Sequence, residues 1–386
     1  MRTSGQITGV RLAQTPSAQE LRSRFERHSA FTVGVEEELL VCDPETLDLA
    51  PLAGELLRRL PQDRAFKGEM PAAQLELASP VAATVGEACA ALLAARHEAA
   101  DAAGGDAVLA AAGAHPFASG IGQLESGERY DAIQEEFAGV ARRQLCFGLH
   151  VHVAVPGADR ALAVFNALRE HLPLLAALGA NAPFYEGRDT GLASVRPKMC
   201  DLLPRQGVPP AVPSWEALAD ELAWGARSGV MADAAQWWWE ARLHPRLGTV
   251  EVRVPDAQPT IGDAAALAAV VHCLVAWLAA RADAGDLGEP AAGWRIGENR
   301  WSACRHGVTG RFADVRDGSA RPTADVVREL LVDLAPFARD LGCSGELARA
   351  HHLVDHPPHE RLRLAARDGG PRAAAAWLVR RFLTAD

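Results

Sequence analysis

Four short segments in which apolar and ionisable residues alternate constrain the fold of this chain most strongly. Successive side chains of a β-strand point to opposite faces, so residues two apart share a face. Each segment is therefore predicted to be a strand with one apolar face and one face that carries ionisable groups. These groups are Glu36 and Glu38 in 31–41, Glu76 in 73–78, His150 and His152 in 145–155, and Glu251 and Arg253 in 248–254.

The ionisable faces have a composition that is unusual for exposed strand faces. Exposure to solvent alone would account for the polar residues of any single strand. Exposed strand faces usually carry lysine, threonine and mixed charges, whereas these faces carry Glu and His with one Arg. Glu36, Glu38, Glu76 and Glu251 on one surface would repel each other unless cations lay among them. Carboxylates suit Mg²⁺ or Mn²⁺, and one or two imidazoles admit Mn²⁺. The pattern therefore favours a divalent-metal site.

The ratio of ligand types bears on the chemistry of such a site. Zinc hydrolases also use His-x-His, but catalytic zinc prefers ligand sets rich in nitrogen and sulfur. Carboxylates outnumber histidines here, which favours a cage that clamps phosphates. Arginines would complete it, and Arg253, Arg300 and Arg305 are the candidates.

Composition excludes several other classes of protein. The net charge of −10 offers no basic surface for nucleic acid or anionic membrane. The two lysines, Lys67 and Lys198, lie outside any Walker A phosphate loop. The seven cysteines form no Cys-x-x-Cys, so a thiolate zinc cage and a redox dithiol are not indicated. We expect the cysteines to be structural and catalytically dispensable.

The pattern of the chain predicts a flexible N-terminal tail over residues 1–28 and a single catalytic domain over 29–386. No signal peptide is evident, and the most apolar stretch, 264–280, is shorter than a membrane span and contains His272. A cytoplasmic location is therefore expected. A fifth strand is predicted at 107–112. Helices are predicted at 84–103, 128–143, 159–178, 214–228, 261–281, 323–341 and 371–384.

The chain resembles the carboxylate–amine ligase family, also called glutamate–cysteine ligase type 2, from about Phe31 onward. Several short motifs carry the resemblance, and their order and spacing together make it specific. They are Gly34-Val35-Glu36-Glu37-Glu38, Gly68-Glu69 with Leu75-Glu76-Leu77-Ala78, Gly113-Ala114-His115-Pro116-Phe117, Gly148-Leu149-His150-Val151-His152-Val153, Ala193-Ser194-Val195-Arg196-Pro197, Gly248-Thr249-Val250-Glu251-Val252-Arg253-Val254, and Asn299-Arg300-Trp301 with Ala303-Cys304-Arg305.

The resemblance implies an α+β, glutamine-synthetase-like fold, in which a curved, mostly antiparallel sheet forms a funnel with helices on its outer face. It also implies the roles of the ionisable residues. Glu38 and Glu76 would hold one metal ion, with Glu69 as a further ligand, and Glu36, His150 and Glu251 would hold another. His152 would face the nucleotide phosphates, Arg253 the transferred phosphoryl group, and Arg196 a substrate carboxylate. An ion pair between Asp189 and an arginine is the structural alternative for the Arg196 loop, and Lys198 would either reach a phosphate or lie exposed.

The implied reaction is ATP-dependent ligation of a small carboxylate and a small amine through an acyl phosphate, with ATP and Mg²⁺ or Mn²⁺ as cofactors. The family name points to glutamate and cysteine. A metal-dependent amidase or hydrolase that uses the same cage without ATP is the alternative, and a binding protein that has lost turnover is a third reading. The intact Glu-x-Glu, His-x-His and Glu-x-Arg elements weaken that third reading. Neither nucleic acid nor membrane is expected as a partner, and a homo-oligomer is left open.

Overall fold

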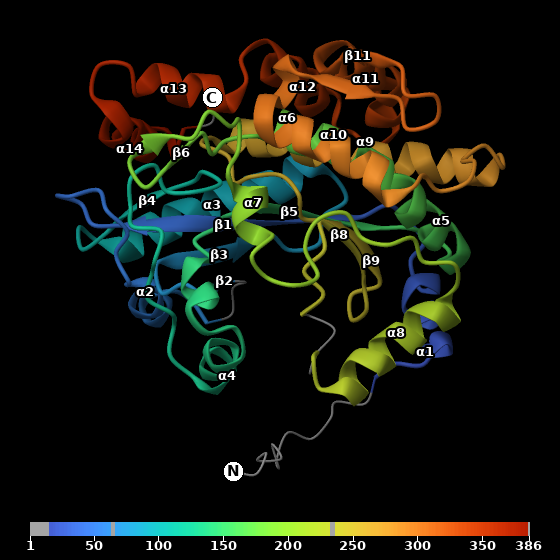
Figure 1. Ribbon diagram of the computed structural model, residues 1–386, viewed down its shortest axis with the longest axis horizontal. Coiled ribbons are helices and arrows are strands. Elements are labelled where there is room, and N and C mark those ends of the chain that lie inside the picture. The colour runs from blue at the N-terminus through green and yellow to red at the C-terminus, as the bar shows by residue number, and fades with distance from the viewer. Residues whose placement is uncertain (1–14, 63–65, 232–235, 385–386) are drawn as a thin grey trace.

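The computed structural model describes residues 15–62, 66–231 and 236–384 (Figure 1). Its main sheet is antiparallel at every strand pair, in the order β2-β3-β1-β5-β9-β8, and β4 pairs with the end of β1. These strands are β1 (Val33–Cys42), β2 (Phe66–Gly68), β3 (Gln74–Ala78), β4 (Val108–Ala110), β5 (Leu149–Ala154), β8 (Ala241–His244) and β9 (Thr249–Val252). Two small sheets pair β6 (Phe184–Tyr185) with β7 (Arg188–Asp189), and β10 (Arg311–Ala313) with β11 (Ala320–Pro322).

Helices make up most of the remaining regular structure. They are α1 (Ala18–Glu26), α2 (Ala53–Arg59), α3 (Val85–Ala103), α4 (Glu128–Phe137), α5 (Ala158–Leu168), α6 (Leu172–Leu178), α7 (Arg196–Cys200), α8 (Trp215–Ser228), α9 (Ile261–Asp283), α10 (Gly293–His306), α11 (Thr323–Asp340), α12 (Ser344–Asp355), α13 (Pro358–Ala365) and α14 (Gly370–Arg381). Short 3-10 turns occupy Ala138–Arg143, Arg169–His171 and Gly307–Thr309. The predicted α+β class, with a mostly antiparallel sheet, is confirmed.

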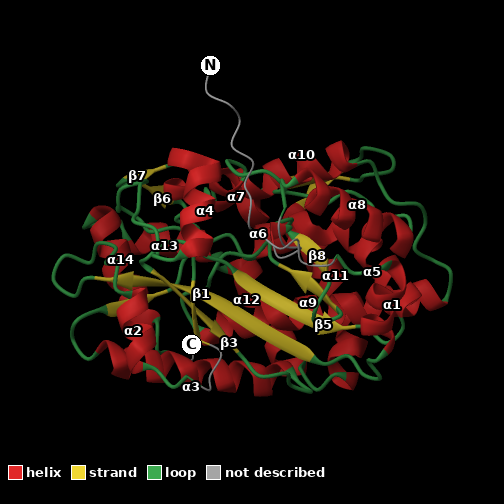
Figure 2. Cartoon of the chain, turned by 90° about the horizontal axis from the view of Figure 1, so that it is seen from below, coloured by secondary structure: helices red, strands yellow, loops and turns green. Residues whose placement is uncertain are grey.

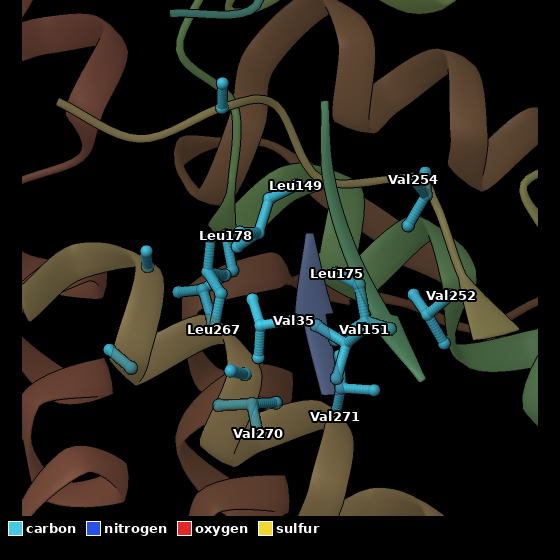
Figure 3. Close-up of a cluster of buried hydrophobic side chains, with 14 of the residues drawn as sticks. Val35, Leu149, Val151, Leu175, Leu178, Val252, Val254, Leu267, Val270 and Val271 are labelled. Carbon is cyan, nitrogen blue, oxygen red and sulfur yellow. The ribbon is translucent and has the colours of Figure 1, made fainter. Parts of the chain in front are cut away.

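The apolar face of the main sheet packs against helices. Val35 of β1, Val151 of β5 and Val252 of β9 are almost fully buried. They lie in one cluster with Leu267 and Val271 of α9 (Figure 3). Fully burying such a side chain stabilises the fold by about 1.5–3 kcal/mol. This packing fixes which strand face points inward, and thereby fixes where the ionisable residues point.

The other face of the sheet is not covered in the same way. Seen from below in Figure 2, strands β1, β3 and β5 lie in view with helices around their margin. In Figure 1, α4 and α8 extend below the sheet on its two sides. The ionisable strand positions belong to this open face.

Residues 18–26 form a packed helix, α1, so the expectation of a flexible tail over 1–28 is wrong for this stretch. Ser17 and Glu20 form a capping box, in which each side chain accepts a hydrogen bond from the other residue's backbone N–H. Leu21 and Phe25 are fully buried, and the Phe25 ring lies 4.8 Å from that of Trp215 on α8. Leu21 and Phe25, four residues apart, form the apolar contact of this short helix, and the sequence alone did not reveal its partner. Residues 1–14 of the expected tail lie outside the described residues.

Other predicted elements agree with the structure except at their ends. The predicted helix 159–178 is divided into α5 and α6 by a 3-10 turn next to Pro173, and 128–143 ends as a 3-10 turn. Strands β2 and β8 and several helices, including α10, were not predicted. Two helical stretches, 158–178 and 261–283, pass a length and hydropathy test for membrane spans, but 67% and 89% of their apolar windows are buried inside the protein. Buried core helices pass the same test.

Candidate active site

Strand register brings the ionisable side chains of the open face together. Glu36 on β1 lies opposite His150 on β5, and Glu38 lies opposite Glu76 on β3. On the other side, His152 lies opposite Glu251 on β9. Because paired residues of antiparallel strands project to the same face, four strands contribute to one cluster.

Glu36 lies at the centre of this cluster, between the two histidines. Its Oε2 is 3.5 Å from His150 Nδ1 and 3.5 Å from His152 Nε2. Burial opposes ionisation of Glu36, but the two imidazoles beside it outweigh this effect and hold its pKa well below the usual range. Burial, assisted by Arg253, lowers the pKa of His150 to about 3. His150 is therefore neutral at pH 7, as a metal-ligating imidazole must be.

The Glu38 side of the cluster has the opposite electrostatic character. Burial raises the pKa of Glu38 to about 7. Burial also raises the pKa of Glu76 to about 8, and repulsion from Glu69 and Glu36 adds to this shift. The pKa of Glu69 is raised by burial and then by Glu38. The three carboxyl groups repel each other when ionised, and the nearby cationic groups do not prevent the rise in their pKa values.

Glu251, by contrast, is held by two guanidinium groups. Arg242 of β8 donates from Nε to one carboxylate oxygen and from Nη2 to the other, the latter at 3.2 Å. Arg253 donates to Glu251 Oε1 at 2.5 Å, and the same Nη1 lies 3.4 Å from His150 Nδ1. Burial disfavours the charged form of Glu251, but the arginines and His152 override it and its pKa is strongly lowered. Arg253 thereby links Glu251 to His150.

The cluster fits divalent cations. Two groups of ligand atoms, each within 4.8 Å of one another, are Glu36 with His150 and Glu251, and Glu38 with Glu76 and His150. Nε2 of His150 and Nε2 of His152 are buried and have no hydrogen-bond partner among the described residues. Buried polar atoms without partners are costly in a folded protein, and a cation next to these nitrogens would satisfy them. A neutral imidazole has one lone pair, so His150 can serve only one ion at a time.

A pocket continues from the cluster toward α7. Glu38, Glu69 and Arg253 line one side of it, and Arg196 lines another. Arg196 is 8% exposed and donates to the backbone oxygens of Val254 and Arg253 at 3.1 and 3.2 Å. Its Nε has no partner within the described part of the chain. The guanidinium is thus fixed in place beside the cluster with a donor to spare.

Gly148 and two cysteines shape the same pocket. A Cβ at Gly148 would lie 2.2 Å from Nη2 of Arg196, so a side chain there would displace the Arg196 guanidinium. The Gly148 N–H donates to Glu38 Oε2 at 2.5 Å. Cys146 and Cys200 are half-buried in the pocket wall and hydrogen-bonded to each other. Their catalytic dispensability stays a prediction.

The other predicted arginines and Lys198 do not join the cluster. Arg300 is buried and engaged with Asp201 at 2.7 Å and Glu240 at 2.6 Å, so it clamps α10 to α7 and to the start of β8. Lys198 pairs with Asp201 at 2.8 Å. Arg305 donates to the Gly191 carbonyl and lines a separate pocket. Direct roles for these three in binding ATP or substrate stay predictions.

The ion pair considered for the loop before α7 exists, and its arginine comes from α13. Arg363 donates to both oxygens of Asp189 at 2.8 Å, and also to the Leu192 carbonyl at 2.8 Å. This pair does not replace the role considered for Arg196, because Arg196 lies in the pocket and contacts neither partner.

Two basic residues of the cluster were missed from the sequence. Arg242 lies on β8, where it shares a face with His244, so the alternation in 241–244 was an available signal. Lys67 lies on β2 opposite Glu76 and contacts it at 2.7 Å. β2 has only three residues, too few for alternation to be recognised.

Comparison with solved structures first defines the class of fold. The crystal structure of glutamate–cysteine ligase from Francisella tularensis in complex with AMP matches with a TM-score of 0.69 and 15% identity, over 92% of this chain and 89% of that one. At this level of identity the match shows a shared fold.

Sequence comparison then gives the family. The model of glutamate-cysteine ligase family 2 matches residues 32–376. A Rubrobacter xylanophilus protein with the provisional name glutamate–cysteine ligase 2-3 is 43% identical over 85% of this chain and 90% of its own. A Thermobifida fusca protein with the provisional name glutamate–cysteine ligase 2 is 34% identical over 90% of this chain and 89% of its own. The chain belongs to glutamate–cysteine ligase family 2, and the resemblance seen in its motifs is confirmed. None of these comparisons supports the amidase or hydrolase alternative.

Proposed function

We propose that this protein is an ATP-dependent carboxylate–amine ligase that joins L-glutamate and L-cysteine to form γ-glutamylcysteine, ADP and phosphate. The observation that carries the proposal is the convergence of Glu36, Glu38, Glu76, His150 and Glu251 on the open face of the sheet, in two groups of metal-ligand geometry. Family membership supports the ligase chemistry and the names of its relatives support the two substrates.

Mg²⁺ or Mn²⁺ fits the donor set of the cluster. Glu38 and Glu76, with Glu69 beside them, would hold one ion, and Glu36, His150 and Glu251 would hold another. Oxygen donors with one imidazole match the preference of these ions. When bound, such ions neutralise charge between phosphoryl oxygens. The same cluster without cations would keep several buried carboxyls in mutual repulsion.

The protein's own residues have positioning and electrostatic tasks. The substrate carboxylate oxygen attacks the γ-phosphorus of ATP, and the bond from that phosphorus to the bridging oxygen breaks with release of ADP. The amine then attacks the acyl carbon, phosphate leaves and the nitrogen loses a proton. Arg253 would face the transferred phosphoryl group and His152 the nucleotide phosphates, where charge is greatest in the transition state. No protein nucleophile is required.

Arg196 is the candidate partner for a substrate carboxylate. It lines the pocket together with Arg253, and its buried Nε has no hydrogen-bond partner among the described residues. Two backbone carbonyls hold its Nη atoms. A guanidinium that is fixed before substrate binds loses little conformational freedom on binding. The cytoplasmic location and the absence of nucleic-acid and membrane partners stay predictions.

The proposal is tested by measuring ADP release with Mg²⁺, ATP, and a panel of acids and amines that includes L-glutamate and L-cysteine. We expect full ADP release only when both partners are present, with one amide formed per ADP. Omission of the acid should reduce ADP release to background, since no carboxylate then remains to accept the phosphoryl group. If phosphate release never depends on an added carboxylate, the ligase proposal fails.

A further inference from the structure

Lys67 places a positive charge between the two groups of candidate metal ligands. Its Nζ lies 2.7 Å from Oε1 of Glu76 and 3.6 Å from Oε1 of Glu36. Glu76 belongs to one ligand group and Glu36 to the other. A divalent ion held by these ligand groups would draw on the negative charge of the same two carboxyl groups, so the ammonium and the ion compete for that charge.

Lys67 also differs from the other cations of the cluster in its freedom to move. Arg242 and Arg253 are tied to Glu251, and their side chains are only 10% and 18% exposed. The Lys67 side chain is 53% exposed and extends from the short β2 at the edge of the sheet. A lysine ammonium on its flexible stem can turn toward solvent without movement of the backbone.

We propose that Lys67 is a displaceable counter-ion of the metal site: its ammonium holds the Glu36 and Glu76 carboxyl groups in the metal-free protein and leaves them when a divalent ion binds. This inference rests on the proposed function only in that a divalent ion occupies the cluster. It assigns Lys67 a positioning role, outside the bond-making steps. The affinity of the wild-type protein for the ion is then lowered by the free energy needed to displace the Lys67 ammonium.

The first consequence is that removal of the lysine charge strengthens metal binding. We expect Lys67→Met to bind Mn²⁺ more tightly than wild type in the absence of nucleotide, by roughly 5–150-fold, the usual range for coupling between two sites. Mn²⁺ binding is measured from the loss of the free-ion electron paramagnetic resonance signal, so turnover plays no part. Lys67→Arg keeps the charge and should restore wild-type affinity or weaken binding further.

Lys198→Met is the matched control, because Lys198 is the other lysine of the chain and lies outside the cluster. It should leave Mn²⁺ affinity unchanged. Equal or weaker Mn²⁺ binding by Lys67→Met than by wild type would overturn the inference. Failure of every variant to bind Mn²⁺ would overturn it together with the metal assignment. Turnover that is independent of a carboxylate would remove only the proposed reaction.

The small number of lysines allows a direct observation of the displacement. Reductive methylation with ¹³C-formaldehyde labels Lys67, Lys198 and the N-terminal amine, and Lys67→Arg identifies the Lys67 signal by its loss. On titration with Mg²⁺, the Lys67 resonance should shift in step with binding while the Lys198 resonance stays in place. A Lys67 resonance that does not move while Mg²⁺ binds would contradict the proposal.

Discussion

Neighbouring glutamates of β1 lie on opposite faces of the sheet and have opposite surroundings. Glu37 faces the helices, where both of its oxygens accept hydrogen bonds from Arg96 of α3 at 2.7 and 2.9 Å. Both side chains of this pair are fully buried. Glu36 and Glu38 face the open side, among other carboxyls and two histidines. The backbone alternation of a single strand therefore separates two kinds of buried acid.

The two kinds of buried glutamate differ in which group neutralises their negative charge. On the helix-covered face a fixed guanidinium neutralises Glu37, so that acid is part of the structure. On the open face the pKa values of Glu38 and Glu76 are raised, to about 7 and 8, because burial and neighbouring carboxyls disfavour their charged forms. A buried acid without a full internal partner is a site for an external cation, and we propose that this distinguishes Glu38 and Glu76 from Glu37.

The largest expected effect concerns the Glu37–Arg96 pair on the helix-covered face of the sheet. Arg96→Met should lower the free energy of unfolding by about 3–5 kcal/mol, because it leaves Glu37 buried without a partner. Urea denaturation followed by circular dichroism measures the change. Arg58→Met, at an exposed position of α2, should shift stability by less than about 0.5 kcal/mol. A loss of stability for Arg96→Met as small as that of Arg58→Met would mean that the two faces do not differ in this way.

The second effect concerns Glu36, one residue away. Glu36→Gln should reduce turnover by about 10²–10³-fold, the scale of losing one electrostatic contact in an active site, while its unfolding curve stays close to that of wild type. ADP release and urea denaturation on the same preparation give both numbers. Glu45→Gln is the matched change at an exposed turn and should leave both unchanged. Wild-type turnover by Glu36→Gln would exclude Glu36 as a ligand.

The smallest effect is the pH dependence of metal binding. Since the raised pKa values keep Glu38 and Glu76 protonated below about pH 7, an ion must displace protons to bind there. We expect Mn²⁺ affinity to fall by about tenfold for each pH unit below 7 and for each proton displaced. Titrations at pH 6, 7 and 8 measure this slope. Glu38→Gln should bind more weakly but with a shallower slope, and a slope of zero in wild type would contradict the raised pKa values.

The fold was predictable where apolar and ionisable residues alternate over enough positions to identify a strand. The faces of β1, β5 and β9 followed from a period of two, because a shift of one residue would exchange the buried and open faces. Helices with clear caps also agreed, such as α8 after Ser214 and α9 after Thr260. The short strand β2 and the helix α1 escaped prediction, since their stability comes from contacts with distant partners.

The site was predictable in its acids and histidines but less so in its bases. The alternation places Glu36, Glu38, Glu76, His150 and Glu251 on the ionisable faces of their strands, and strand pairing brings those faces together. A guanidinium on a long side chain can reach several partners, and local sequence does not say which. Arg300 accordingly pairs with Asp201 and Glu240, and Arg242, which was not predicted, contacts Glu251.

Arg96 also reaches the last helical region of the chain. Besides holding Glu37, its Nη1 donates to the Phe382 carbonyl at 2.7 Å, and its guanidinium lies 4.9 Å from the centre of the Phe382 ring. The carboxyl-terminal residues are thereby anchored to the strand that also carries Glu36 and Glu38. A truncation that removes Phe382 would consequently loosen Arg96 and, through it, the strand that carries Glu36 and Glu38.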